Sequence, residues 1–328
     1  MDISVGGTIV TPARKRRRFP RRTLTWLAVT PFAAWAVARV AGLERGSLTT
    51  QFMTATPYIA AGSLLPLLVA AVSRNRTATA VAAITTTAFA FTVLPRAMGS
   101  AEATPGRPLK VLTINMLFGR ADADSIVDLV RKYQPDVLST QELTPGAVAN
   151  LDEAGLRDLM PHRVLQDEWS AGGSGLFAKY PLKPLWDVMP VAGHKMPGAM
   201  LSLPGGKPIE IIDVHPYPPL GAQVREWREA LEAFPAASPD TVRVLAGDFN
   251  ASLDHAELRQ LLSRGYKDAA DTVGAGLIPT WPANKRVPPI ITIDHVLVDQ
   301  RAGVRAVSVH TVPGTDHRAV FAELTVPL

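Results

Sequence analysis

Asp248 and Asn250 stand two residues apart in the run VRVLAGDFNAS, residues 242–252, where an apolar segment typical of a β-strand ends. Residues i and i+2 of a strand point to the same face, so this carboxylate and amide would project together while Phe249 points away. Gly, Asp and Asn also favour turns, and a plain turn explains this short stretch equally well when it is taken alone.

Polar residues of the same kind end most of the other apolar, strand-like segments. In chain order these residues are Asn115, Glu142, His215, Asp248 with Asn250, Asp294, and Asp316 with His317. A turn or a cap would explain any one of them, but not their repeated position at strand ends. Phosphoester cleavage needs this kind of set, because phosphoryl charge must be neutralised, a water positioned and the leaving oxygen stabilised.

The segments that would position these residues alternate between strand-like and helix-like patterns. Strands are predicted over residues 109–117, 136–143, 209–215, 242–249, 290–298, 306–312 and 319–326. Helices are predicted over residues 121–133, 144–159, 222–234 and 254–265, the second with Thr144 as its N-cap and Pro145 at its first position. Strands outnumber helices, which predicts an α/β sandwich rather than a strictly alternating, doubly wound sheet.

Charge is divided unevenly along the 328 residues. The formal net charge is +5, but residues 1–108 hold 13 Lys and Arg against 3 Asp and Glu, and residues 109–328 hold 21 against 26. The larger part therefore lacks the basic surface that tracks a nucleic-acid backbone, which argues against a nuclease. The absence of cysteine excludes disulfides, a thiolate nucleophile and a zinc–thiolate site.

The N-terminal third has the pattern of a membrane anchor. Seven positive charges in residues 14–22 precede three uncharged, largely apolar runs over residues 23–38, 52–72 and 77–94. A cleaved signal peptide explains the first run alone, and buried helices of a soluble protein are another reading, but three runs in succession favour a retained anchor. The positive loops predict a cytoplasmic N-terminus and an extracellular C-terminal part. We predict a basic tail (residues 1–22), three transmembrane helices (23–96), a linker (97–108) and a catalytic domain (109–328).

The ordered set of strand-end residues resembles the endonuclease/exonuclease/phosphatase superfamily, whose fold is DNase I-like. The run GGSGLFAKYPL, residues 172–182, also resembles a strand of that family, with Ala178 and Lys179 where the family has Ser and Arg. The resemblance covers residues 109–328. It implies a four-layer α/β sandwich, in which two sheets pack face to face with helices outside and the active site lies at one rim.

The resemblance also implies roles for individual residues. Mg²⁺ or Mn²⁺ would be held by Glu142, with Asn115 as a ligand or an orienting group and Asp316 as a further carboxylate. Asp248 would position or activate the attacking water, and Asn250 would hold that water or a phosphoryl oxygen. His317 with its partner Asp294, and His215 near the phosphoryl group or leaving oxygen, complete the predicted catalytic set. Trp281 is equally compatible with an aromatic wall of the site and with plain packing, and His295 is interpreted as structural.

Three spans before such a domain resemble the VanJ-type proteins of glycopeptide-resistance clusters. That likeness implies a membrane-anchored hydrolase of a phosphorylated lipid such as undecaprenyl pyrophosphate, with a role in teicoplanin-type resistance and with no nucleic-acid or protein partner expected. The alternatives are an extracellular nuclease or sphingomyelinase-like phosphodiesterase, and a non-catalytic binding protein. The carboxylate partner of His215 stays open between Asp167 and Glu168, and loops 191–198 and 216–223 are expected to form the head-group pocket.

Overall fold

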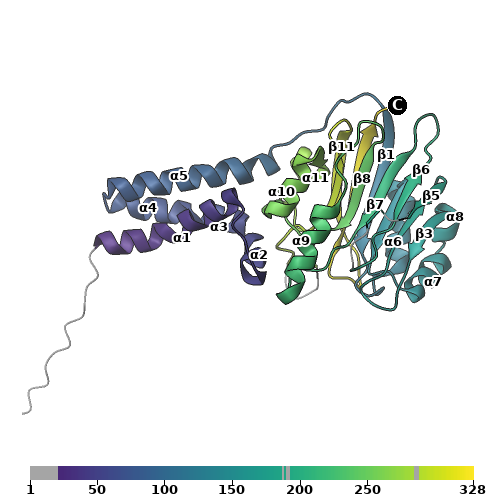
Figure 1. Cartoon of the computed structure of the whole chain (residues 1–328), viewed down its shortest axis with the longest axis horizontal. Helices are drawn as coiled ribbons and strands as arrows, with labels where there is room; N and C mark the ends of the chain where they lie inside the picture. The colour runs from purple at the N-terminus through teal and green to yellow at the C-terminus, as the bar shows by residue number, and fades with distance from the viewer. Residues whose placement is uncertain (1–20, 187, 190–192, 284–287) are drawn as a thin grey trace, which may run out of the picture.

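The computed structural model of the chain describes residues 21–186, 188–189, 193–283 and 288–328. N-terminal helices extend to one side of a two-sheet sandwich, as Figure 1 shows. Most of the predicted basic tail lies outside the described residues, and its last two residues, Arg21 and Arg22, already belong to the first helix.

The sandwich consists of two six-stranded mixed sheets. The first has the order β11-β12-β1-β2-β4-β3, from β1 (Arg107–Asn115), β2 (Val137–Gln141), β3 (His162–Gln166), β4 (Ser174–Ala178), β11 (Gly303–Thr311) and β12 (Arg318–Val326). The second has the order β5-β6-β7-β8-β10-β9, from β5 (Leu182–Leu185), β6 (Gly198–Leu201), β7 (Ile209–Val214), β8 (Arg243–Asp248), β9 (Tyr266–Asp268) and β10 (Asp294–Asp299).

Alternation along the strands builds a core between the sheets and two further cores outside them. Val111 and Val244 point into the central core, whereas their neighbours Leu112 and Leu245 point outward beneath the helices. The helices outside the first sheet are α6 (Ala123–Tyr133), α7 (Pro145–Glu153) and α8 (Leu156–Leu159). Outside the second sheet lie α9 (Val224–Ala233) and α10 (Ala256–Ser263). The predicted α/β sandwich with external helices is therefore confirmed.

Strand directions bring the polar strand ends to one rim of the sandwich. The pairs β1–β2 and β7–β8 are parallel, so their carboxyl ends meet at the same edge. Strand β10 runs antiparallel to β8, with Asp294 directly opposite Asp248, and β12 runs antiparallel to β1. The starts of β10 and β12 therefore share that edge with the ends of the other four strands.

Two predicted elements differ from the observed ones. The strand expected from residue 290 begins at Asp294, and the preceding residues instead form an isolated bridge between Ile291 and Trp281. Pro288 and Pro289 lack backbone donors, which disfavours a longer strand there. The helix expected over residues 144–159 is divided into α7 and α8 by Gly155, whose φ of 97° is left-handed and ends the first helix.

The N-terminal helices are α1 (Arg21–Ala41), α2 (Ser47–Met53), α3 (Thr56–Gly62), α4 (Leu64–Val72) and α5 (Arg76–Val93), followed by the 3₁₀ turn η1 (Leu94–Ala97). Two segments among the described residues, Arg21–Ala41 and Arg76–Ala97, have the length and apolarity to cross a membrane. The second predicted span is bent by 64° between α2 and Thr56–Val72, and it makes a third only if the bent pair crosses as one. Pro57 causes part of this break, since it has no N–H to donate to the Met53 carbonyl.

Candidate active site

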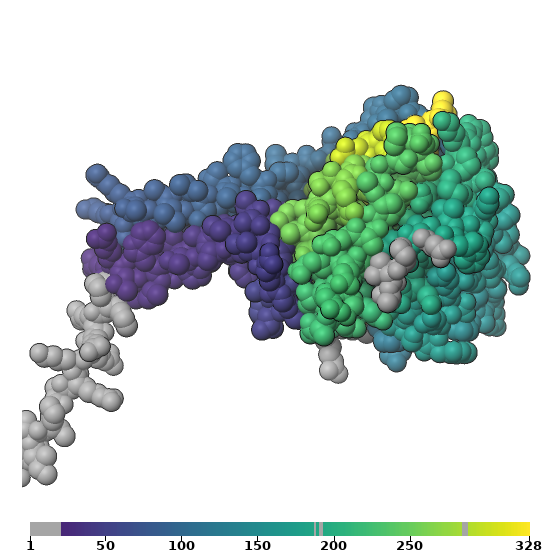
Figure 2. All heavy atoms as spheres, in the orientation of Figure 1, coloured from purple at the N-terminus to yellow at the C-terminus, as the bar shows by residue number. Residues whose placement is uncertain are grey.

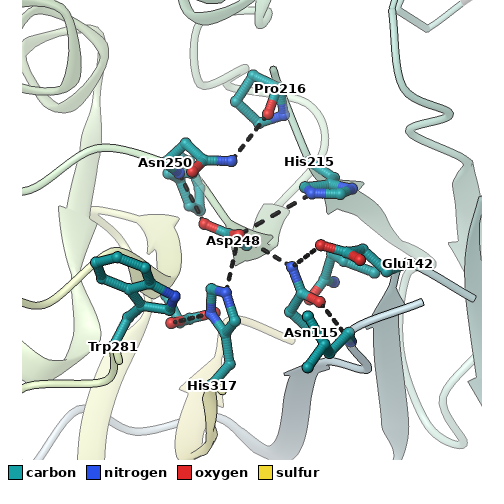
Figure 3. A network of polar contacts seen from close by, with 12 residues as sticks. Asn115, Glu142, His215, Pro216, Asp248, Asn250, Trp281 and His317 are labelled. Atoms are coloured by element: carbon teal, nitrogen blue, oxygen red, sulfur yellow. Dashed lines mark hydrogen bonds and ion pairs between the residues drawn. The ribbon is translucent and has the colours of Figure 1, made fainter. Parts of the chain in front are cut away.

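A cavity of about 540 Å³ lies at the rim where the strand ends converge. Seven of the predicted residues line it: Glu142, His215, Asp248, Asn250, Trp281, Asp316 and His317. The other two are buried and contact these residues: Asn115 donates to Asp248, as Figure 3 shows, and Asp294 accepts from His317. The structure thus brings all nine predicted residues into one site.

Asp248 is the centre of the network and is almost fully buried. Its Oδ2 accepts a hydrogen bond from Asn115 Nδ2 at 3.1 Å and lies 3.7 Å from His317 Nε2 and 4.0 Å from His215 Nε2. The pKa of Asp248 is raised to about 7, mainly by burial. The Asp294 carboxylate adds to the rise, and His317 and the hydrogen bonds from Asn250 and Asn115 offset it only in part. An acid with such a pKa can accept and release a proton near neutral pH.

The turn and the strand interpretations of the stretch around Asp248 are each partly correct. The Asn250 backbone N–H donates to Asp248 Oδ1 at 2.8 Å, which is the local turn expected of Asp. Asn250 has a left-handed φ of 48° and donates from Nδ2 to the Pro216 carbonyl at 3.1 Å, so both side chains line the cavity. Phe249 points to the other face and packs in the outer core, as alternation predicts.

His317 is held by Asp294. Its Nδ1 donates to both Asp294 carboxylate oxygens at 3.0 Å, which leaves Nε2 facing Asp248. Burial acts to lower the pKa of His317, but the carboxylates of Asp294 and Asp248 outweigh burial and raise it to about 10. His317 therefore carries a positive charge at neutral pH, next to the position where phosphoryl charge would develop.

Glu142 follows β2 with a φ of 54°, a left-handed conformation that a glutamate rarely adopts and that costs about 1 kcal/mol or more. Its Oε2 accepts from the Phe118 backbone N–H at 2.8 Å, and its Oε1 accepts from Asn115 Nδ2 at 3.1 Å. Burial raises the pKa of Glu142 despite these hydrogen bonds. Asn115 thus acts as a donor that orients two carboxylates, since its own Oδ1 is occupied by the Leu117 N–H.

Similarity to known proteins identifies the fold and the class of chemistry. The model of the Endonuclease/Exonuclease/phosphatase family matches residues 112–317, which is well over half of the chain. The chain belongs to this family. Its members are phosphoester hydrolases, typically dependent on a divalent metal, so the site is that of a phosphoester hydrolase. A comparison with curated proteins gave no match.

Solved structures of the family share the sandwich at low sequence identity. An endonuclease/exonuclease/phosphatase from Beutenbergia cavernae has a TM-score of 0.53 and 19% identity, covering 67% of this chain and 72% of its own. A family protein from Bacteroides thetaiotaomicron has a TM-score of 0.52 and 16% identity over 68% of this chain and all of its own. Humanized D. rerio TDP2 has a TM-score of 0.51 and 17% identity over 67% of this chain and 99% of its own. At sequence identities this low, the structural similarity establishes a shared fold alone.

The carboxylates of this endonuclease/exonuclease/phosphatase site fit a hard divalent cation. Glu142 and Asp316 face the same cavity, and Asp316 Oδ1 is a buried oxygen without a hydrogen-bond partner among the described residues. Its other oxygen accepts from Trp281 Nε1 at 3.0 Å, so Trp281 both orients Asp316 and walls the cavity. Oxygen ligands of this kind suit Mg²⁺ or Mn²⁺. A bound cation would neutralise phosphoryl charge and stabilise the leaving oxygen.

A second group of potential ligands is less suited to a metal. Asp248, Asp294 and His317 offer atoms within 4.8 Å of one another. The His317 imidazole has a pKa of about 10 beside the Asp294 and Asp248 carboxylates, and in its protonated form neither ring nitrogen offers a lone pair to a cation. Glu142 and Asp316 could thus hold a cation, and Asp248 and His317 could position a water or move a proton.

His215 differs from His317 because burial lowers its pKa well below the usual value. A neutral imidazole at this place can hydrogen-bond a phosphoryl or leaving oxygen without adding charge. Its carboxylate neighbour is Asp248, rather than Asp167 or Glu168, which had been the candidates by position. Glu168 instead lies 3.6 Å from the Lys195 ammonium.

Two aromatic residues of the cavity carry no motif in the sequence. The His194 ring lies 4.3 Å from that of His215 and 4.4 Å from that of Tyr217, between centroids. All three line the cavity. His194 and Tyr217 come from the two loops expected to form the head-group pocket, residues 191–198 and 216–223. Residues 191–192 lie outside the described part of the chain. Only the chain's folding shows that these loops meet.

Proposed function

We propose that this protein is a membrane-anchored, extracytoplasmic, metal-dependent phosphohydrolase that acts on a lipid-linked phosphate or pyrophosphate such as undecaprenyl pyrophosphate. Its N-terminus would be cytoplasmic and its catalytic domain extracellular. The chain would contact the bilayer through its N-terminal helices and bind neither nucleic acid nor a protein partner. A role in teicoplanin-type glycopeptide resistance would follow from hydrolysis of this carrier of wall synthesis.

The surface of the N-terminal helices supports a membrane location. Large apolar side chains are exposed along them, including Leu27 (61%), Leu65 (66%), Val72 (75%), Ile84 (70%) and Phe91 (77%). Water-soluble proteins seldom expose so continuous an apolar surface, whereas lipid chains would cover it at no cost.

Contacts between the helices and the catalytic domain support a fixed arrangement of the two. Arg39 of α1 and Arg96 of η1 both pair with the fully buried Asp254 carboxylate, at 3.1 and 2.6 Å. His255 Nε2 donates to the Thr50 carbonyl of α2 at 2.8 Å. In Figure 2 the N-terminal helices, in purple, accordingly abut the green face of the catalytic domain.

The observation that carries the proposal is the composition of the catalytic cavity. Gln51 and Thr54, from α2 and its C-terminal cap, line the same cavity as His215, Asp248 and His317. A catalytic site that shares its wall with the membrane-proximal helices is suited to a substrate that stays in the bilayer.

The first test is phosphate release from undecaprenyl pyrophosphate by the full-length protein in detergent, with Mg²⁺ and with a chelator, beside His317→Ala. We expect Mg²⁺-dependent release that is lost in the variant, while supercoiled DNA stays intact in a parallel nicking assay. Nicking without phosphate release would overturn the lipid assignment and favour the nuclease alternative. Activity in neither assay, on a folded protein, would favour a non-catalytic binding protein.

The resistance role has its own test. Expression of the wild-type gene in a teicoplanin-sensitive host is expected to raise the inhibitory concentration of teicoplanin, and expression of His317→Ala is not. Equal protection by both proteins would mean that resistance does not depend on hydrolysis.

A further inference from the structure

The catalytic cavity has a polar floor and an apolar outer wall. The floor holds the carboxylates and histidines described above. The outer wall is formed by Leu117, Phe118, Tyr217, Pro218, Pro219, Leu220, Ile290, Ile291 and Ile293. The phosphate chemistry requires only the polar floor. The apolar wall is therefore suited to binding a second, apolar part of the ligand.

Two of the three apolar segments of this wall, residues 217–220 and 290–293, are attached to the N-terminal helices. Ser47 Oγ of α2 donates to the Pro219 carbonyl at 3.1 Å and accepts from the Gly221 N–H at 2.9 Å. Tyr58 Oη of α3 donates to the Ile290 carbonyl at 2.6 Å. Helices α2 and α3 therefore hold the two loops apart and close the space between them.

Helix α2 presents different faces to the cavity and to the outside. Ser47 and Gln51, one turn apart, contact the catalytic domain, whereas Leu48 and Phe52, also one turn apart, are 69% and 60% exposed. At the wall itself, Phe118, Leu220 and Ile290 are between 44% and 49% exposed. Exposed apolar surface is thus present both on the outer face of α2 and at the wall of the cavity.

We propose that the space bordered by Gln51, Thr54, Leu220 and Ile290 is a subsite for the hydrocarbon chain of the substrate, next to its phosphate group. This inference rests on the proposed function and names what its substrate must carry. This space is continuous with the catalytic floor. A hydrocarbon chain bound here would therefore belong to the same molecule as the phosphoester that is cleaved. The chain would pass from the bilayer beside α2 and α3, so the anchor itself selects lipid phosphates over soluble ones.

The absence of native cysteine allows a direct test that does not depend on turnover. Thr54→Cys places one thiol in the subsite, and Thr49→Cys places one on the exposed side of α2 as the matched control. Each full-length variant would be labelled with a maleimide in detergent, alone, with a polyprenyl pyrophosphate, or with inorganic pyrophosphate. With the lipid at about ten times its Kd, mass action predicts roughly tenfold slower labelling of Thr54→Cys and no change for Thr49→Cys.

The labelling result and the phosphate-release assay separate two failures. Protection of Thr54→Cys by the lipid but not by inorganic pyrophosphate supports the subsite, whether or not the lipid is hydrolysed. Hydrolysis without protection would overturn the subsite and leave the proposed function standing. Equal protection by inorganic pyrophosphate, or equal protection of both thiols, would also overturn it, because the effect would then come from the head group or from the micelle.

The catalytic counterpart is a pair of bulky substitutions. Thr54→Trp is expected to lower kcat/KM for a long-chain lipid phosphate about tenfold more than for a short water-soluble phosphoester, a difference equivalent to about 1.4 kcal/mol. Thr49→Trp should change neither value. An equal loss on both substrates would place Thr54 in the general structure of the site rather than in a chain subsite.

Discussion

At the scale of single residues, the surroundings of each side chain give the two histidines different charges and the two groups of carboxylates different roles. His317 is cationic because Asp294 and Asp248 face it, and His215 is neutral because burial dominates. Glu142 and Asp316 both face the cavity, and Asp316 Oδ1 has no hydrogen-bond partner among the described residues, so this pair of carboxylates could accept a cation. The residue types alone could not assign these roles, since the same histidine serves either purpose.

Asp294→Asn should reduce hydrolysis strongly without unfolding the protein. Asp294 holds the His317 ring through both carboxylate oxygens, and an amide cannot accept with both of its atoms. Losing this oriented, charged imidazole should lower kcat on a phosphodiester by about 10²–10⁴-fold. Asp299→Asn, the same change at the other end of β10, is the control and should leave kcat within about threefold. Similar losses in both would mean that the strand, and not the His317 contact, is responsible.

Glu142→Gln should abolish the stabilisation of the protein by Mg²⁺. A cation present at about a hundred times its Kd adds about 2.7 kcal/mol to the free energy of unfolding, and removing its main ligand should remove most of this gain. Without metal two effects oppose each other. Removing the charge relieves the burial that raises the pKa of Glu142, but an amide cannot accept from both the Phe118 N–H and Asn115 Nδ2, so the variant should lie within about 1–2 kcal/mol of the wild type. Thermal unfolding with Mg²⁺ and with chelator measures both effects. Glu153→Gln on α7 is the exposed control, and a Mg²⁺ response retained in Glu142→Gln would contradict the assignment.

At the scale of elements, close packing between strands fixes Gly247 in the Gly-Asp-Phe-Asn stretch. A Cβ at this position would lie 2.1 Å from the Val214 carbonyl oxygen of β7. Gly247→Ala should therefore push β8 away from β7 and displace Asp248, costing about 1–3 kcal/mol and most of the activity. In the first turn of α7, a Cβ at Gly146 would make only an ordinary van der Waals contact, 3.9 Å from Thr144 Oγ1, so Gly146→Ala should be neutral or stabilising. Thermal unfolding and phosphodiester hydrolysis of the two variants test this, and a stable, active Gly247→Ala protein would refute it.

Acidification should loosen α2 from the catalytic domain through His255. Its Nδ1 accepts from the Ser252 N–H at 2.8 Å, so the neutral ring donates from Nε2 to Thr50. Burial lowers the pKa of His255, and the hydrogen bond to Thr50 and the nearby carboxylates offset this only in part. A proton on Nδ1 would face the Ser252 N–H, so protonation would break that bond and displace the ring that holds Thr50. Because the folded pKa lies below the unfolded value of about 6.5, the stabilisation by the neutral ring is complete above that pH and is lost as the pH falls through the folded pKa.

Hydrogen exchange of the α2 amides measures this effect. Protection corrected for intrinsic rates should fall between about pH 7.5 and pH 5.5 in the wild type. His255→Gln cannot be protonated, so its α2 protection should be lower at the higher pH and nearly constant across this range. An equal decrease in both proteins would assign the pH dependence to other groups.

The elements also show what the sequence could and could not predict. Asn115 and Asp248 were predictable because each is the last inward-facing residue of an apolar strand, where the sequence shows both the strand alternation and the strand end. Asp294 was predictable from the same alternation, although it begins its strand rather than ending it. His194, Gln51 and Thr54 were not, because their place in the cavity depends on loops and helices that are separate in the sequence and meet only in the fold. The sequence did not predict the bend before Pro57, because a long uncharged, apolar run has the same pattern whether its helix is straight or bent.

At the scale of the whole molecule, one buried carboxylate joins the anchor to the enzyme. Asp254 accepts hydrogen bonds from Arg39 and from both terminal nitrogens of Arg96, which come from opposite ends of the N-terminal region. All three side chains are nearly inaccessible to solvent. Arg39, in the last turn of α1, turns inward to this ion pair.

Asp254→Ala would leave two buried guanidinium groups unpaired, which should cost about 3–5 kcal/mol. If the anchor forms the wall of the chain subsite, hydrolysis of a lipid phosphate should fall at least about tenfold more than hydrolysis of a soluble phosphodiester. Asp128→Ala, which breaks the exposed pair with Arg131, should cost less than about 1 kcal/mol and leave the ratio of the two activities unchanged. Unfolding and both rates would be measured on full-length protein in the same detergent. If Asp254→Ala lost both activities in equal proportion while remaining folded, the catalytic domain would not need its docked anchor to handle lipid, and the anchor would serve only to keep the enzyme at the membrane.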